Sequence, residues 1–225
     1  MPKIINGIVR FKSEVYPQKE ALFKKLAERQ DPEALFITCS DSRIDPSLLV
    51  QTEPGELFIC RNAGNIVPPH SNYTGGITAT IEYAVAVLKV KHIIICGHSD
   101  CGALTAVLNP ERVASLPHVS QWLSYARAAH LIVEEKAPNA SPDEKLTMLI
   151  QENVLLQLQH LKTHPYVAAR YATNKVKLHA WTYDIGEGLV NAYDERTHKF
   201  LPVEERYADW AKECVDGGDK QCDCD

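Results

Sequence analysis

Four short apolar runs constrain the fold of this 225-residue chain more than any other feature. They are ALFITC at 34–39, LFIC at 57–60, HIIIC at 92–96 and LHAWTY at 178–183. Each run is short and rich in branched or aromatic residues, so each predicts a strand that is covered on both faces. Helix-length segments separate the runs. This alternation predicts an α/β fold with a central, mainly parallel β-sheet of about four strands, flanked by helices.

The segments between the runs carry helix signals. GGITATIEYAVAVLKV at 75–90 begins at two glycines, and SDCGALTAVLN at 99–109 follows the third run directly. The stretch 117–161 is also mostly helical, with an interruption at 138–142. The amphipathic spacing of its last part, from Val154 to Leu161, predicts a helix packed on the sheet or on another subunit rather than a binding groove.

The two ends of the chain have their own patterns. Apolar residues at helical spacing predict two helices within residues 1–30, an arm that packs on the domain or on a partner subunit. Residues 31–205 are expected to form the α/β domain, in which Gly186 and Gly188 turn the fourth strand into an antiparallel edge strand. Residues 206–225 should hold a helix end and a mobile acidic tail.

Charge and cysteine usage exclude several classes of protein. The net charge of -5 is spread along the chain, without the basic patch that binds nucleic acid or a membrane surface. The N-terminus lacks the apolar core of a signal peptide, and no stretch has transmembrane length. Seven cysteines is an odd number, and Cys60 and Cys96 lie in predicted buried strands. We therefore expect a protein of the reducing cytoplasm.

Three residues have the chemistry and placement of a metal site. His98 and Cys101 lie three residues apart, after a predicted strand and at the start of a helix, so one turn can direct both at one point. Cys39 ends another strand, and neighbouring parallel strands bring their carboxyl ends to the same rim of a sheet. Two thiolates and an imidazole suit zinc, and three protein ligands leave one position for water or substrate.

Each part of this site has a plainer interpretation. A buried core cysteine or a satisfied core histidine explains either half of His98-x-x-Cys101 as readily as a metal does. Asp41 and Arg43, two and four residues after Cys39, could form a bidentate pair that fixes a carboxylate beside the metal. They could equally form an ordinary loop salt bridge of little energetic value. Cys222 and Cys224 could bind metal or form a redox pair, but no histidine completes a site there.

Five motifs decide between these readings because they occur together and in order. They are CSDSR (39–43), EPGELF (53–58), RNAGNIVPP (61–69), IEYAV (81–85) and GHSDCGA (97–103). Over roughly Ile4 to Phe200 the chain resembles the β-carbonic anhydrases, zinc enzymes that hydrate carbon dioxide to bicarbonate and a proton. The resemblance implies that Cys39, His98 and Cys101 bind one Zn²⁺ per subunit. It also implies that Asp41 and Arg43 form a catalytic dyad, and that the building unit is a homodimer, which can associate further.

Within that family the chain is similar to the plant-like members and to bacterial cyanate-associated enzymes. By that similarity, Gln30, Phe58 and Tyr83 belong to a substrate pocket formed at the dimer interface. Phe58 and Tyr83 are also typical core residues, and Gln30 could simply end a helix. Phe36 stands where another subgroup, one with a non-catalytic bicarbonate site, carries tryptophan. Its presence argues against allosteric inhibition by bicarbonate.

The expected chemistry follows from charge. Zinc lowers the pKa of bound water from about 15.7 to about 7, so that zinc-bound hydroxide can attack carbon dioxide. Asp41 would accept the hydroxide hydrogen while Arg43 keeps Asp41 ionised, and Gln30 would donate to a substrate oxygen. Thiolate ligands oppose loss of the proton, so activity should rise into mildly alkaline pH. An alternative resting state, with Asp41 as fourth zinc ligand, stays open.

Two other functions fit parts of the pattern. The same site could hydrolyse a carbon dioxide analogue such as carbon disulfide or carbonyl sulfide, which assays with both kinds of substrate would distinguish. A non-catalytic metal module would have a closed fourth position, and Asp41, Arg43 and the pocket residues argue against it. The sequence leaves open whether the purpose is bicarbonate supply and carbon utilization, pH balance or cyanate metabolism. It also assigns no histidine as proton acceptor.

Overall fold

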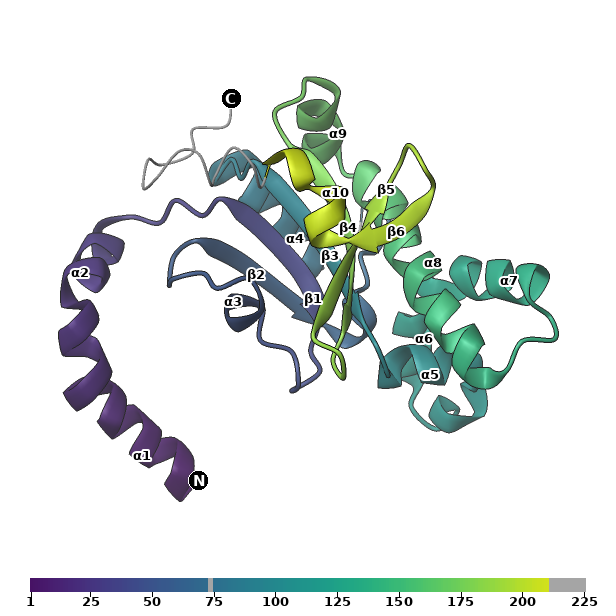
Figure 1. Cartoon of the computed structure of the whole chain (residues 1–225), viewed down its shortest axis with the longest axis horizontal. Coiled ribbons are helices and arrows are strands. Elements are labelled where there is room, and N and C mark those ends of the chain that lie inside the picture. The colour runs from purple at the N-terminus through teal and green to yellow at the C-terminus, as the bar shows by residue number, and fades with distance from the viewer. Residues whose placement is uncertain (73–74, 211–225) are drawn as a thin grey trace.

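The computed structural model describes residues 1–72 and 75–210. These residues form one six-stranded sheet with the order β2-β1-β3-β4-β5-β6 (Figure 1). The strands are β1 (Ala34–Cys39), β2 (Leu57–Asn62), β3 (His92–His98), β4 (Lys177–Asp184), β5 (Leu189–Asp194) and β6 (Lys199–Pro202). The first four pair in parallel, and β5 and β6 pair antiparallel. The predicted α/β fold with a mainly parallel sheet is confirmed.

The antiparallel edge is longer than we predicted. The reversal after β4 occurs at 185–188, where Gly188 has φ +69, a left-handed conformation that glycine adopts without strain. A further strand, β6, pairs with β5 and forms the outer edge. It was not predicted, because KFLP is four residues long, ends in proline and is too short to show an alternating pattern.

Helices flank the sheet. The α-helices are α1 (Pro2–Arg10), α2 (Glu20–Glu28), α3 (Pro46–Leu49), α4 (Gly76–Glu82), α5 (Gly102–Leu108), α6 (Pro117–Leu123), α7 (Arg127–Lys136), α8 (Pro142–Lys162), α9 (Pro165–Ala172) and α10 (Val203–Arg206). The helix start predicted near Gly75 and the break predicted before Pro142 are both present. A π-helical turn at Tyr83–Val87 continues α4. Within residues 1–72 and 75–210, no helix is long and apolar enough to cross a membrane.

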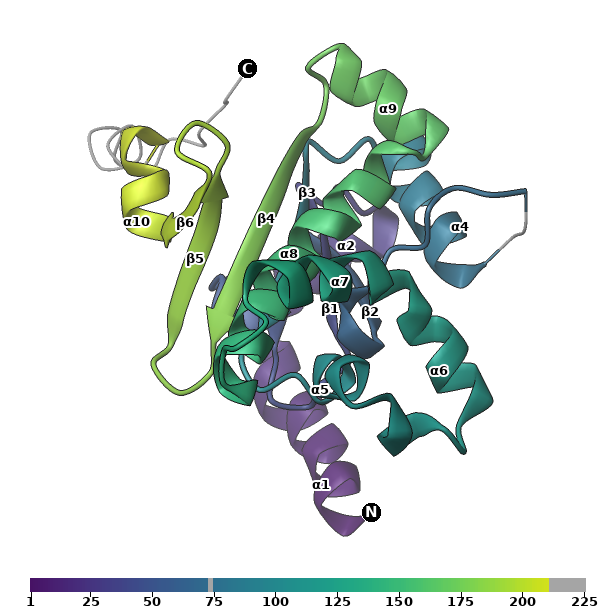
Figure 2. The same cartoon turned by 90° about the vertical axis from the view of Figure 1, so that its right-hand side faces the viewer.

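Helix α8 is the main cover of one sheet face, together with α4 and α9 (Figure 2). A capping box starts it, in which Ser141 Oγ accepts from the backbone of Glu144 and the Glu144 carboxylate accepts from the backbone of Ser141. Its residues Val154 and Leu158 pack in the cluster that includes Leu35 of β1. Gly97 of β3 permits this close approach, since a Cβ there would meet Val154 Cγ2 at 2.8 Å. This close packing holds the end of β3, where His98 lies, against α8.

The N-terminal arm consists of α1, α2 and the helical turns between them, and it extends away from the sheet (Figure 1). No residue of α1 or α2 is buried. Ile4, Ile5, Ile8 and Val9 are each more than half exposed. The predicted N-terminal helices are confirmed, and the apolar side chains of α1 find no cover within the described residues. Of the predicted C-terminal segment 206–225, residues 211–225 with Cys214, Cys222 and Cys224 lie outside the described residues.

Candidate metal centre and dyad

The ends of β1 and β3 bring three ligand-type side chains together, as the parallel topology requires. The thiols of Cys39 and Cys101 and the imidazole of His98 are buried, and their ligand atoms lie within 4.8 Å of one another. The two Sγ atoms are 4.0 Å apart. Over the described ranges no second group of three His, Cys, Asp or Glu has this geometry. The grouping can therefore hold a metal ion.

The orientation of His98 leaves one ring nitrogen for a metal. Nδ1 lies 2.8 Å from the carbonyl oxygen of Ser99, which can only accept, so Nδ1 carries the proton and donates. Nε2 is buried without a hydrogen-bond partner. Burying an unpaired imidazole nitrogen is costly, whereas coordination to a metal would satisfy it. This buried, unpartnered nitrogen is what a metal ligand requires.

The two thiols depend on each other electrostatically. The pKa of Cys39 is lowered chiefly because the Cys101 thiol hydrogen-bonds to it, with help from the backbone N–H of Gly64. The same interaction with Cys39, together with burial, raises the pKa of Cys101. The pair therefore holds one negative charge readily, and a divalent cation is needed to favour the second thiolate.

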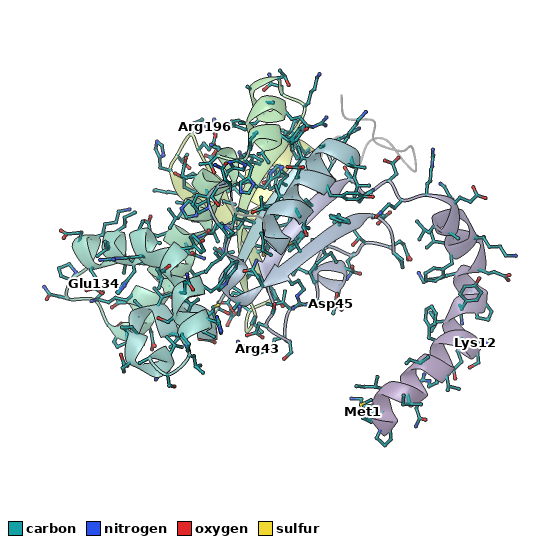
Figure 3. The ribbon with its side chains drawn as sticks, turned by 180° about the vertical axis from the view of Figure 1, so that it is seen from behind. Met1, Lys12, Arg43, Asp45, Glu134 and Arg196 are labelled. Carbon is teal, nitrogen blue, oxygen red and sulfur yellow. The ribbon has the colours of Figure 1, made fainter. Side chains whose placement is uncertain are left out.

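Asp41 and Arg43 form a bidentate ion pair at the same rim, where Figure 3 labels Arg43. Arg43 Nε donates to Asp41 Oδ1 at 2.9 Å and Nη2 donates to Oδ2 at 2.8 Å, while the backbone N–H of Arg43 donates to Oδ1 at 3.0 Å. These bonds hold the pKa of Asp41 well below its usual range. Asp41 Oδ2 lies 3.9 Å from His98 Nε2. Arg43 thus holds an ionised carboxylate beside the three ligand-type residues.

Two residues that build this rim, Arg61 and Gly64, were not among the predicted site residues. Arg61 Nε donates to the Cys39 carbonyl at 3.0 Å and Nη2 donates to the Asp41 carbonyl at 2.7 Å. The backbone N–H of Gly64 donates to Cys39 Sγ at 3.4 Å. Both residues stand in the motif RNAGNIVPP, which we noted without assigning them a role. A usable signal was that this motif directly follows the apolar run at 57–60, since neighbouring parallel strands end at one rim; the structure places Asn62 in register with Cys39.

The three expected pocket residues do not gather at the metal centre of their own chain. The Phe58 and Tyr83 rings lie 6.0 Å apart, and Tyr83 is 44% exposed. Phe58 is in register with Leu35, four residues before Cys39, which is about 13 Å along a strand. Gln30 is exposed and precedes β1, whose opposite end carries Cys39. Within one chain, therefore, the pocket residues and the metal centre lie toward opposite ends of β1.

Known proteins are similar to this chain in sequence. Residues 34–190 match the family model described as carbonic anhydrase. A carbonic anhydrase from Pseudomonas aeruginosa is 47% identical over 205 residues, which cover 91% of this chain and 93% of that relative.

Solved structures share the fold. The β-carbonic anhydrase CcaA has a TM-score of 0.87 at 39% identity, covering 90% of this chain and 91% of its own. One of two tetrameric β-carbonic anhydrases from the ascomycete Sordaria macrospora has a TM-score of 0.77 at 32% identity, covering 84% of this chain and 94% of its own. With its Cys-His-Cys group, its mixed sheet and these relatives, the chain belongs to the β-carbonic anhydrase family.

Proposed function

We propose that this chain catalyses the reversible hydration of carbon dioxide to bicarbonate at a zinc ion held by Cys39, His98 and Cys101. The observation that carries the proposal is the buried, unpartnered Nε2 of His98, which lies beside two thiols and 3.9 Å from the ionised Asp41. Membership of the carbonic anhydrase family supports the reaction.

The donor set fits zinc. Tetrahedral zinc with Zn–S bonds of about 2.3 Å separates two sulfurs by about 3.8 Å, and the Sγ atoms of Cys39 and Cys101 are 4.0 Å apart. When bound, zinc supplies a Lewis acid with an open fourth position that makes water a nucleophile near neutral pH. The thiols must stay reduced to bind it, because a disulfide would draw the sulfurs to about 2.05 Å. This requirement supports a cytoplasmic location.

Asp41 and Arg43 orient the reaction. Because both Asp41 oxygens accept hydrogen bonds from Arg43, the carboxylate stays ionised and its direction is fixed. In that state Asp41 can accept a hydrogen bond from the attacking water and direct the oxygen lone pair at the carbon of carbon dioxide. The same bonds hold Asp41 back from acting as a further ligand. We therefore favour the open site over the closed resting state.

A second copy of the chain completes the substrate pocket in this proposal. Gln30, Phe58 and Tyr83 lie too far from their own metal centre to contact a small substrate there, so they would serve the centre of a partner. The exposed side chains of Ile59, Tyr83 and Val87 provide apolar surface for that partner to cover. The tetrameric Sordaria macrospora structures support an assembly built from several chains.

Stopped-flow measurement of carbon dioxide hydration, on protein whose zinc content is quantified, tests the proposal. We expect one zinc per chain, and hydratase activity that is lost on chelation and restored by zinc. Parallel assays with carbonyl sulfide and carbon disulfide should show little turnover. Zinc-loaded protein without hydratase activity would contradict the proposal, whatever its activity on the analogues.

A further inference from the structure

One peptide group beside the metal centre is held at both ends. It joins Ala63 to Gly64, directly after β2. Its N–H, on Gly64, donates to Cys39 Sγ at 3.4 Å, and its carbonyl, on Ala63, accepts from Trp122 Nε1 at 2.9 Å. The indole N–H, the peptide and the sulfur therefore form a hydrogen-bonded series, in which each bond polarises the next.

The next peptide group is held as well. The Gly64 carbonyl accepts from Asn153 Nδ2 at 3.1 Å, and Asn153 Oδ1 accepts from Gln157 Nε2 at 2.8 Å. Gln157 Oε1 accepts from the backbone N–H of Val67 at 2.9 Å. A backbone N–H can only donate, so it fixes the orientation of both amides and directs the Asn153 NH₂ at Gly64.

Trp122 and Asn153, the two side chains that anchor these peptide groups, lie on helices distant in sequence from Cys39. Trp122 comes from α6, where its ring packs edge-on against Tyr125 with centroids 5.9 Å apart. Asn153 comes from α8 and is fully buried. Between the anchors, Gly64 has φ +79, a left-handed conformation that turns its N–H toward Cys39.

We infer that Trp122 and Asn153 are positioning residues of the metal centre, which set the donor strength of Cys39 through the Gly64 backbone. The inference rests on the metal site proposed above. A hydrogen bond to a thiolate withdraws electron density from sulfur, and partners beyond the ligands commonly change metal affinity by about 10-fold to 100-fold. Trp122 adds to that withdrawal by polarising the peptide group. Asn153 fixes the orientation of the Gly64 backbone, so that its N–H stays directed at the sulfur.

The replacement Trp122→Phe tests the role of the indole N–H, since it keeps an aromatic ring but removes the donor. In cobalt-substituted protein, we expect the thiolate-to-cobalt charge-transfer band to move to lower energy, because the sulfur becomes more electron-rich. Zinc release to a competing chelator should become about 10-fold slower, because a more electron-rich sulfur is a stronger donor to zinc. The matched control is Trp181→Phe, which removes an indole donor to Tyr207 Oη at 3.1 Å and should change neither readout.

A second measurement needs no variant. In wild-type protein loaded with ¹¹³Cd, the Gly64 amide proton should show scalar coupling to the metal across the N–H···S bond. Absence of that coupling, or a Trp122→Phe protein with the wild-type band and release rate, would overturn the inference. Wild-type protein that binds no metal, or binds zinc without hydrating carbon dioxide, would instead defeat the proposed function. The two failures are therefore distinguishable.

Discussion

Asp41 and Asp45 show how similar side chains in one loop have different roles. Asp41 accepts three hydrogen bonds from Arg43 beside the metal centre, whereas Asp45 caps α3 by accepting from the backbone of Leu48. Asparagine preserves the cap nearly as well as aspartate. It cannot preserve the negative charge that Arg43 binds. In the proposed function, therefore, the charge of Asp41 is needed for chemistry and that of Asp45 is not.

We predict that Asp41→Asn lowers the turnover of carbon dioxide at least about 100-fold, the usual contribution of a positioned acid or base, while zinc stays bound. Asp45→Asn, the matched control, should keep near-normal turnover. Stopped-flow kinetics and metal analysis on both variants check this. Near-normal turnover in Asp41→Asn would rule out the role that we assign to Asp41.

The contact between β4 and the segment after β6 depends on a neutral histidine. His179 of β4 lies with Nε2 3.0 Å from His92 Nδ1 and with Nδ1 2.8 Å from Tyr207 Oη. Burial, together with the positive charge of neighbouring groups, lowers the pKa of His179 to about 3. The folded protein therefore binds a proton at His179 far less readily than the unfolded chain, whose histidines titrate near about 6.5.

The sign of the pH dependence follows. Below about pH 6.5, His179 binds a proton in the unfolded chain but not in the folded protein. The free energy of unfolding therefore falls as pH falls from about 6.5 toward about 3. Thermal unfolding between pH 7 and pH 4.5, above the range of most carboxyl groups, should show this loss. His179→Gln should reduce the slope without abolishing it, because burial also lowers the pKa of His92, His160 and His164. Exposed His118→Gln is the control, and equal slopes in the two variants would contradict the assignment.

The whole molecule has surfaces that one chain leaves uncovered. The arm exposes a row of apolar side chains, and Met1 and Lys12 mark how far it reaches from the sheet domain (Figure 3). Exposed apolar rows of this kind usually mark a protein interface. The distance between the pocket residues and their own metal centre leads to the same conclusion. The active site made from two chains that we propose would explain both features.

Subunit complementation tests that assembly. We expect Asp41→Asn chains and Gln30→Leu chains to be poorly active alone, and heterodimers of the two to regain activity, because one of their sites receives intact Asp41 from one chain and intact Gln30 from the other. If Gln30 served its own metal centre, both sites of the heterodimer would be defective. Stopped-flow assays on purified heterodimers, beside each homodimer, decide between the two, and absence of restored activity would contradict a shared site.

The sequence alone was enough to predict the four parallel strands, the arm helices, the Cys-His-Cys group and the Asp41–Arg43 pair. Most of those features depend on short-range patterns: apolar runs, a spacing of three between His98 and Cys101, and a spacing of two between Asp41 and Arg43. Cys39 joined the group because neighbouring parallel strands end at one rim and because five family motifs occur together. Only the tertiary structure revealed β6, the contacts of Arg61, and the anchoring of Gly64. The Trp122 and Asn153 bonds to that loop join residues 59 and 89 positions apart. Contacts at such separations leave no local pattern, because they form only after α6 and α8 have packed beside the sheet.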